Sequence, residues 1–380
     1  LKGGYFEGAV FLNEASAGSG SQIREGTIFE EQAKAAHTVG LKQTILFPFV
    51  TLGSLINFCD CFMAGGTDRK NHSEVGSSYI HFNYTPNQDK ATASLMGDVP
   101  GGVMLNQPPI FLGGQGGLVG PGRLAYGTII AAGTINRKDE LRPGRLIFGG
   151  AGKGGSIPYN PGVYRSEKRI VNNNVVYIAN LLALRQWYYH VRSIFVSELF
   201  PRELLDGLQE KLGIDIDERI VRLGELCLKM PVTGRSKENR SDKLVKQKKE
   251  LRDRWPELND FLQACSDREG DSAVRDAFLK TVNLGIDESG NDYITVIKGL
   301  EKKQAERGTL WLQGIVDEHR RMGEFILTGS GQLLSLAALG ADCGISAVTA
   351  RQWLSVLEAS YLVFRLPPYH RNFGKRLVKT

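Results

Sequence analysis

The stretch from Phe111 to Ile135 reads FLGGQGGLVGPGRLAYGTIIAAGTI, and its spacing decides the predicted fold. Aliphatic residues recur every six positions, and a small residue follows each of them four positions later. The aliphatic set is Leu112, Leu118, Leu124 and Ile130, and the small set is Gly116, Gly122, Thr128 and Thr134. This period fits neither a helix nor a plain strand. It is typical of a hexapeptide β-helix, in which the aliphatic residues point into a narrow interior and successive coils stack.

The same rhythm can be followed backwards along the chain, with gaps. Val39 and Ile45 are six positions apart. Between Gly97 and Pro109 the rhythm fails, and the segment GDVPGGVMLNQPP reads as a loop that leaves the repeat. The alternative interpretation is a Gly-rich loop in which aliphatic residues recur by chance. Four consecutive matches at both positions argue against that alternative.

Composition divides the chain into two parts and limits the classes of protein. The 380 residues are 42% hydrophobic, which allows two or three domains with a sizeable core. Most of the 45 glycines precede residue 165, and the rest of the chain is rich in Lys, Arg and Glu. The net charge of +6 permits binding of nucleotides or sugar phosphates without requiring nucleic acid. Five scattered cysteines suit a reducing, cytoplasmic setting, and no apolar run reaches the roughly 18 residues that span a bilayer.

The first part of the chain resembles a known family. The resemblance is to the C-terminal left-handed β-helix of the bacterial bifunctional N-acetylglucosamine-1-phosphate uridyltransferase / glucosamine-1-phosphate acetyltransferase. It is carried by EVGSSYIHFNYTPNQDKAT, from Glu74, and by the stretch from Phe111. The family has an Asn-Tyr pair, then a short polar loop and a Thr nine residues after the Asn. Asn83, Tyr84 and Thr92 keep that spacing.

The resemblance implies a ligand set and a site. In this family the β-helix forms trimers and binds acetyl-CoA and an amino-sugar phosphate between subunits. It would make Asn83 and Tyr84 substrate contacts, and it would put acetyl-CoA, as co-substrate, near Gly113 and Ala131. The family's phosphate-binding Lys is matched one position off by Lys90. The Gly-rich opening motif of the family's upstream nucleotidyltransferase domain is absent, so we do not expect uridylyl transfer by this chain alone.

Acetyl transfer needs a base that removes a proton from the attacking amine. The family's base is a His, and counting back from Asn83 places Asp60 there. The catalytic candidates are therefore Asp60, His72 and His81. His81 lies two residues before Asn83, so in a strand both side chains would point to one face. The alternative reading of each His is a surface or hydrogen-bonded residue without a catalytic role.

Two further motifs carry weaker signals. Cys59 and Cys61 flank Asp60, but a metal site needs two more ligands, so we expect buried free thiols and no metal. The run GGAGKGGS from Gly149 looks like a phosphate loop. However, Ile147 stands where the first Gly should be and Gly154 follows Lys153, so we interpret the run as a linker.

The C-terminal segment has its own pattern. FILTGSGQ, from Phe325, reads as a buried strand and a turn, and the following residues read as helix, turn, helix and strand, with Ser346 capping a helix. The segment resembles the winged-helix part of a bacterial and archaeal AAA-type ATPase family. That family's phosphate loop and acidic Mg²⁺ motif should lie upstream, and they are missing here.

Together these patterns predict a fold class and its domains. We expect a β-solenoid, a left-handed parallel β-helix, over residues 1–155. An α-helical domain over 156–318 follows, and then a small winged-helix-like ATPase remnant over 319–380.

Three functional hypotheses follow from the same observations. The first is a cytoplasmic, acetyl-CoA-dependent transferase of the sugar-nucleotide pathway. It would act on a sugar phosphate or nucleotide sugar and be related to UDP-N-acetylglucosamine pyrophosphorylase. The second, favoured by Asp60 in place of His, is a non-catalytic scaffold or sugar-nucleotide sensor. The third is a DNA-binding ATPase fragment. It rests on the tail alone, and nucleic acid is not expected because the basic run 235–254 has no aromatic residues to stack bases.

The same reasoning predicts an assembly. Flat-sided protomers pack well around a closed symmetry axis, so we expect a homotrimer. The loop from Gly97 to Pro109 would then reach the adjacent subunit and bury its apolar residues there, which are Met104, Leu105 and Ile110. In the alternative, the loop folds back on its own coil and the protein is monomeric, with the helical middle covering the free face.

Overall fold

The computed structural model describes residues 3–149, 167–229, 251–264 and 268–328, with six more between 346 and 355. Residues Leu1–Leu327 form one compact unit, and Thr328–Thr380 form a second. The sheets and hollows described below lie in the first unit, as do the helices before Thr328. Apart from Gly149, the run interpreted as a linker falls outside the described residues, and so does most of the winged-helix prediction.

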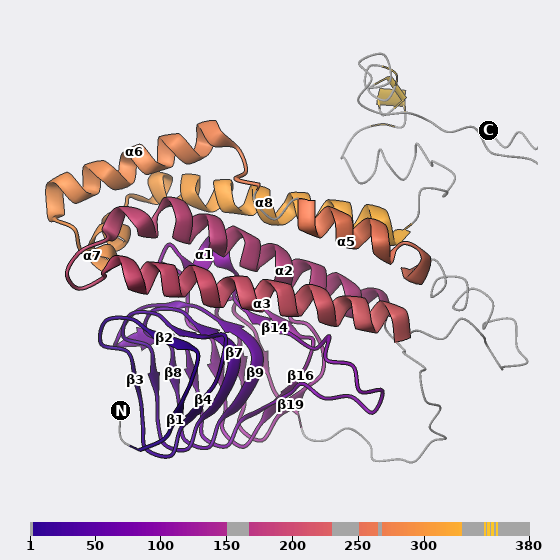
Figure 1. The fold of residues 1–380 in the computed structure, drawn as a ribbon, viewed down its shortest axis with the longest axis horizontal. Helices are drawn as coiled ribbons and strands as arrows, with labels where there is room; N and C mark the ends of the chain where they lie inside the picture. Colours follow the sequence, from indigo (N-terminus) through magenta and orange to yellow (C-terminus); the bar gives the residue numbers. More distant parts are fainter. Residues whose placement is uncertain are drawn as a thin grey trace, which may run out of the picture. The chain divides into compact units, whose positions relative to one another are not determined.

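Short strands form two large sheets and one small pair (Figure 1). The 11-stranded sheet contains β1 (Tyr5–Phe6), β2 (Ala9–Phe11), β4 (Gln22–Ile23), β5 (Thr27–Phe29), β7 (Gly40–Leu46), β9 (Asn57–Met63), β13 (Ile80–Phe82), β14 (Ser94–Met96), β16 (Gly117–Val119), β17 (Arg123–Leu124) and β19 (Ile135–Asn136). The 7-stranded sheet contains β3 (Ser16–Ala17), β6 (Lys34–Ala35), β8 (Thr51–Leu52), β12 (Glu74–Val75), β15 (Phe111–Leu112), β18 (Ile129–Ile130) and β20 (Leu146–Ile147). β10 (Gly66–Asp68) and β11 (Asn71–His72) form an antiparallel pair.

Pairing within the two large sheets is parallel. Gln22 of β4 pairs with Gly40 of β7, which in turn pairs with Asn57 of β9. In the second sheet, Phe111 of β15 pairs with Ile129 of β18, and Ile129 pairs with Leu146 of β20. Side chains in register therefore form rows across neighbouring strands.

The predicted fold class, a left-handed β-solenoid followed by a helical domain and a winged-helix-like tail, is wrong. The described residues form sheets of 11 and 7 short strands with an added antiparallel pair, and helices up to residue 327 belong to the same compact unit. The physical reason is that a local period reports which side chains face inward. It does not report how strands are grouped into sheets or which helices cover them.

The six-residue period does identify interior side chains. Its four aliphatic residues are at most 2% exposed. At Gly116, four residues after Leu112, there is little space for a side chain. A Cβ added there would lie 2.8 Å from the carbonyl oxygen of Thr134. Burial of the aliphatic residues and close backbone packing at the small ones together explain the spacing.

Helices form a layer along one side of the sheets (Figure 1). α2 (Glu167–His190) and α3 (Arg202–Lys229) pack against each other, and both contact strands of the 11-stranded sheet. Beyond them lie α5 (Trp255–Ala264), α6 (Ser272–Ser289), α7 (Tyr293–Gly299) and α8 (Lys302–Thr328). The short helix α1 (Val99–Gly102) interrupts the strands, and the 3₁₀ helix η1 (Arg192–Phe195) follows α2. Among the described residues, no helix is both long and apolar enough to cross a membrane.

The segment from Gly97 to Pro109 folds back under these helices. The backbone N–H of Val99 donates to Asn180 Oδ1 at 2.9 Å, and Thr309 Oγ1 donates to the carbonyl of Pro100 at 3.0 Å. Its apolar side chains are buried within the chain: Met104, Leu105 and Ile110 are 1%, 4% and 0% exposed. These residues therefore do not need a neighbouring subunit to cover them, contrary to the argument that linked this loop to a trimer.

The start of the predicted tail differs from expectation. Residues 325–328 continue helix α8, whereas a buried strand was predicted. The amphipathic helix that precedes them continues through them, because extending an existing helix is easier than starting a new element. Further on, Ser346 Oγ accepts a hydrogen bond from the backbone N–H of Thr349 at 3.1 Å. The predicted capping role of Ser346 is confirmed.

We expect Leu118→Ala to lower the free energy of unfolding by about 2–5 kcal/mol, because it removes a fully enclosed side chain and leaves a cavity. The matched control is Ile135→Ala in the same stretch, where the side chain is 39% exposed and the loss should stay below about 1 kcal/mol. Urea denaturation measures both. Equal losses at the two positions would contradict the interior assigned to the period.

Candidate functional site

The side chains of Asp60 and Gln43 point out of the 11-stranded sheet at neighbouring places on β9 and β7. Asp60 lies in the middle of β9 with a φ of 61°, so residues 60 and 61 are both buried and the usual alternation is broken. Gln43 occupies the matching place on β7, with a φ of 48°. The residues that flank Gln43 pair with the residues that flank Asp60. This left-handed conformation costs a non-glycine residue on the order of 1 kcal/mol. Its effect is to aim both side chains toward α3.

Helix α3 meets these two side chains with Arg219, which is 2% exposed. Arg219 Nη2 lies 2.9 Å from Asp60 Oδ1 and donates to Gln43 Oε1 at 3.3 Å. Its Nη1 donates to the carbonyl oxygen of Lys90 at 3.2 Å. The guanidinium therefore joins α3 to two strands and to the loop after β13. The sequence analysis assigned no role to Arg219.

A second acidic residue of α3, Asp215, lies one helical turn from Arg219 and is also buried. Burial raises the pKa of Asp215 well above its usual range, although the nearby Arg219 opposes the shift. Both carboxyl oxygens lack a hydrogen-bond partner among the described residues. A Cβ added to Gly26, whose φ is 72°, would lie 2.1 Å from Asp215 Oδ1. Glycine at position 26 therefore gives the carboxyl group the space it occupies.

His81 is buried beside the same cluster. Its Nδ1 lies 2.7 Å from the carbonyl oxygen of Cys59, and its Nε2 lies 2.7 Å from Ser94 Oγ. Ser94 Oγ also accepts the backbone N–H of Gly122 at 2.9 Å. A neutral ring that donates from Nδ1 and accepts at Nε2 satisfies every partner. Burial lowers the pKa of His81 to about 4, with Asp60 and the Cys59 carbonyl opposing the shift.

The loop after β13 holds the predicted substrate contacts. Asn83 Nδ2 donates to Asp60 Oδ2 at 3.4 Å, and Thr92 Oγ1 donates to the Asn83 carbonyl at 3.0 Å. The Asn-to-Thr spacing therefore corresponds to a hydrogen bond that closes this loop. Tyr84 is 66% exposed. Lys90 is exposed, and its backbone carbonyl is the group that contacts Arg219.

The other predicted site residues lie elsewhere. His72 belongs to β11, and its Nε2 lies 3.9 Å from Glu74 Oε2. Gly113 and Ala131 are close neighbours beside the 7-stranded sheet, because a Cβ added to Gly113 would lie 2.7 Å from the Ala131 carbonyl carbon. That close backbone approach is a structural reason for glycine at this position. The structure thus gathers Asp60, His81 and Asn83, with His72 in a different sheet.

Burial limits what the gathered residues can do. Asp60 and His81 are each 3% exposed, and their polar atoms already contact protein groups. A substrate amine would have to displace Arg219 to reach the carboxylate of Asp60. The His81 nitrogens are held by a carbonyl and a hydroxyl inside the sheets. The cluster can therefore hold α3 against the sheets without any ligand.

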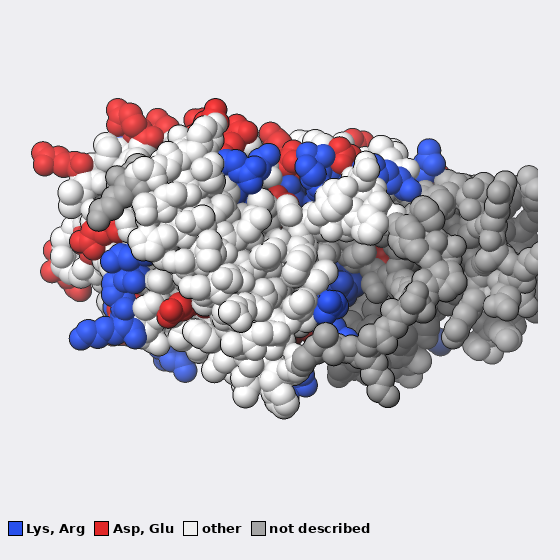
Figure 2. Space-filling view, turned by 90° about the horizontal axis from the view of Figure 1, so that it is seen from below, with Lys and Arg blue, Asp and Glu red and all other residues white. Residues whose placement is uncertain are grey.

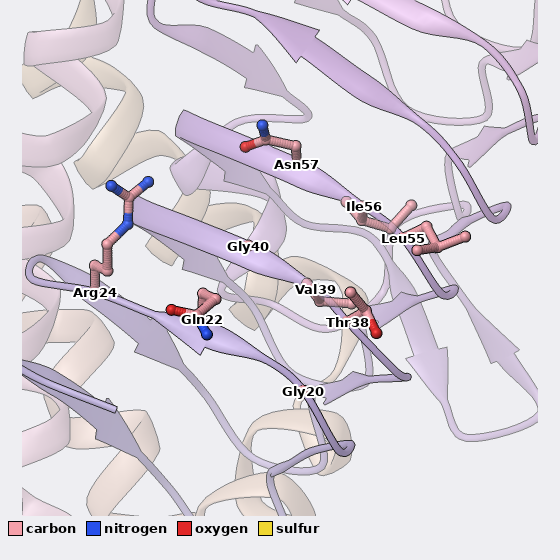
Figure 3. A pocket seen from close by; sticks show the side chains of 9 residues that line it. All are labelled: Gly20, Gln22, Arg24, Thr38, Val39, Gly40, Leu55, Ile56 and Asn57. Carbon is pink, nitrogen blue, oxygen red and sulfur yellow. The ribbon is translucent and has the colours of Figure 1, made fainter. Parts of the chain in front are cut away.

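A shallow hollow of about 440 Å³ lies on the open face of the 11-stranded sheet. Figure 3 shows Gln22, Arg24 and Asn57 around it, with Gly40 on the strand between them. Gln22, Gly40 and Asn57 pair in register, so the missing side chain at Gly40 leaves the space. Arg24 Nη2 reaches across to Cys59 Sγ at 3.6 Å.

A larger hollow of about 640 Å³ lies where η1 meets the start of α7. A buried polar cluster forms its inner side. Arg192 pairs with Glu31 and stacks on the rings of Phe200 and Tyr293, at 4.5 and 3.8 Å from the ring centroids. Beside it, Tyr188 donates to Glu30 Oε1 at 2.6 Å. Burial raises the pKa of Glu30 to about 7, and Arg192 opposes that shift.

In the described part of the chain, no group of three or more His, Cys, Asp or Glu side chains could hold a metal ion. Residues 310–380 match a family described only as a domain of unknown function, DUF8612. The matched range begins inside α8 and covers the tail. No curated protein matches the chain. The matched range does not include the sheets or the two polar clusters.

We expect the native chain to lose more stability, or gain less, than the His81→Gln variant as pH falls from about 6.5 to about 4, because His81 is neutral when folded and protonated when unfolded. A lowered folded-state pKa contributes stability that is present above the unfolded value and is lost below it. The contribution of His81 to the free energy of unfolding is about 3 kcal/mol at most. Urea denaturation at a series of pH values measures it, with His81→Gln as the variant.

His37, which is exposed, provides the control for this prediction. The His37→Gln protein should keep the pH dependence of stability seen in the native chain. An unchanged pH dependence in His81→Gln would show that His81 is not its source.

Proposed function

We propose that this chain is a non-catalytic scaffold. The observation that carries the proposal is the contact of Arg219 with Asp60, which places the predicted catalytic carboxylate beneath helix α3. His81 supports it, because both ring nitrogens are engaged by protein groups. Asn83 supports it as well, because its amide contacts Asp60. The polar residues that would perform acetyl transfer therefore have a complete structural role.

A scaffold needs a contact surface, and an exposed apolar row supports one. Phe111, Ile129 and Leu146 lie in register on the outer side of the 7-stranded sheet, and they are 41%, 45% and 59% exposed. Exposed apolar side chains gathered in this way usually mark a contact surface. Figure 2 shows that the middle of the face opposite the helical layer also carries few Lys, Arg, Asp or Glu side chains.

In this proposal the apolar row binds a second copy of the chain, and closed cyclic symmetry gives a homotrimer. An uncharged row can meet an identical row without repulsion between like charges. Cyclic closure uses a single self-associating face without open-ended growth. The loop from Gly97 to Pro109 plays no part, because its apolar residues are covered by the chain's own helices.

Enzyme assays test the catalytic half of the proposal. With acetyl-CoA and glucosamine-1-phosphate as substrates, we expect acetyl transfer at the rate of the protein-free control, because Asp60 is enclosed. The Asn83→Ala variant should behave like the native chain. Acetyl transfer that is lost in Asn83→Ala would reject the scaffold in favour of an acetyltransferase. Calorimetric titration with UDP-N-acetylglucosamine, if it showed tight binding without turnover, would change the assignment to a sensor.

Light scattering tests the assembly. We expect a trimer mass for the native chain at micromolar concentration and a monomer mass for Ile129→Lys, because a charge in the middle of the row opposes self-association. Gln22→Lys, on the outer face of the other sheet, is the matched control and should remain trimeric. A native monomer would contradict the assembly, and so would a trimer that survives Ile129→Lys.

A further inference from the structure

The hollow between η1 and α7 has features of a ligand site that the scaffold role does not use. Its volume of about 640 Å³ lies in the range of small-molecule pockets. It is lined by four separate segments: the turn at Asn13, the turn at Glu31–Gln32, the region from η1 to Phe200, and residues 291–295 at the start of α7. Such a convergence of distant segments fixes the lining groups relative to one another.

The inner wall holds polar atoms that the protein leaves without partners. Arg192 is 1% exposed, and one of its nitrogens, Nη2, donates to Glu31 Oε1. Its Nε and Nη1 have no hydrogen-bond partner among the described residues, and neither does Glu31 Oε2. These atoms are buried, and buried polar groups without partners are uncommon and need an explanation. They belong to two side chains that pair with each other, so N–H donors and a carboxylate acceptor lie on adjoining residues of the lining.

A ligand that satisfies both kinds of atom carries an acceptor and a donor close together. The α-carboxylate of a free amino acid would accept from Arg192, and its α-ammonium would donate to Glu31 Oε2. Phe200 and Tyr293 stack on the guanidinium and limit its movement. The guanidinium is therefore held in place before a ligand arrives, which lowers the cost of binding.

The exposed residues at the rim of the hollow determine which ligand side chain is favoured. Glu198 and Asp292 line the hollow and are exposed. Asp292 accepts from the backbone N–H of Thr295 at 2.8 Å, and Glu198 has no hydrogen-bond or ion-pair partner among the described residues. The lining carries three carboxylates against the single cation of Arg192. An anion such as a phosphate is disfavoured there, whereas a positively charged side chain is favoured.

We propose that this hollow binds a free basic amino acid, with its α-carboxylate at Arg192, its α-ammonium at Glu31 and its side-chain cation near Glu198 and Asp292. Binding at this place would also tie η1 to the start of α7, since both elements line the hollow. The proposal does not depend on the scaffold function. Loss of one would leave the other intact.

Calorimetric titration of the full chain with L-lysine tests the site, with three matched ligands beside it. Norleucine lacks the side-chain amine, cadaverine lacks the carboxylate and inorganic phosphate is a simple anion. We expect lysine to bind at millimolar concentration or below, and we expect norleucine to bind at least about threefold more weakly, as an exposed charge contact implies. Cadaverine and phosphate should show no binding in the same range.

Two surface variants then locate the binding. Glu198→Gln should weaken lysine about threefold and leave norleucine unchanged, because it removes only the rim charge. Glu203→Gln, on the exposed face of α3, is the control and should bind lysine like the native chain. Thermal unfolding of the unliganded variants confirms that both fold.

A third variant tests the hollow itself. Asn291→Trp places a bulky ring at the exposed rim and should abolish lysine binding. The proposal is overturned if lysine fails to bind the native chain, or if Asn291→Trp binds lysine normally. It is also overturned if Glu198→Gln weakens norleucine as much as lysine, or if phosphate binds as tightly as lysine.

Discussion

The ion pair between Arg219 and Asp60 is the contact on which the arrangement of sheets and helices depends. Both side chains are almost completely buried, and their nearest atoms lie 2.9 Å apart. Removing two charges from water is costly, and the pair is tolerated because further hydrogen bonds satisfy it. Gln43 and the Lys90 carbonyl accept from the guanidinium, and Asn83 donates to the carboxylate, while Arg219 Nε has no hydrogen-bond partner among the described residues. Displacing α3 would leave an uncompensated charge inside the sheets, so this contact specifies where the helix lies.

This constraint bears directly on function. A left-handed backbone at Asp60 aims a carboxylate out of the sheet, which is also how a catalytic side chain would be presented. Here the same geometry presents it to a helix of the same chain. At the hollow beside η1, Arg192 also keeps donors without partners among the described residues, although its guanidinium is held by two rings. Both buried polar clusters therefore keep atoms without partners among the described residues: Arg219 Nε and the Asp215 carboxyl oxygens in one, and atoms of Arg192 and Glu31 in the other. Of these two clusters, the one with Arg192 and Glu31 lines the hollow of about 640 Å³.

The sequence predicted the local features well and the long-range ones poorly. The six-residue period correctly placed Leu112, Leu118, Leu124 and Ile130 in the interior, because inward orientation is a local property of the repeat. The fold class inferred from it was wrong, because the grouping of strands and the helical cover depend on contacts between distant residues. The Asn83-to-Thr92 spacing was meaningful, but it corresponds to a loop-closing hydrogen bond. His72 was grouped with His81 from proximity in sequence, and the antiparallel pair of β10 and β11 separates them. A signal for Arg219 did exist, since Asp215 and Arg219 are charged positions among the buried apolar residues of α3.

A double-mutant cycle between Asp60 and Arg219 tests the central claim most directly. Asp60→Asn and Arg219→Met should each lower the free energy of unfolding by about 3–5 kcal/mol, because each leaves one buried charge without its partner. The double variant should lose clearly less than the sum of the two, with a coupling on the order of 1–3 kcal/mol. Additive losses within about 0.5 kcal/mol would contradict the account, because they would mean that the two side chains do not act as a pair.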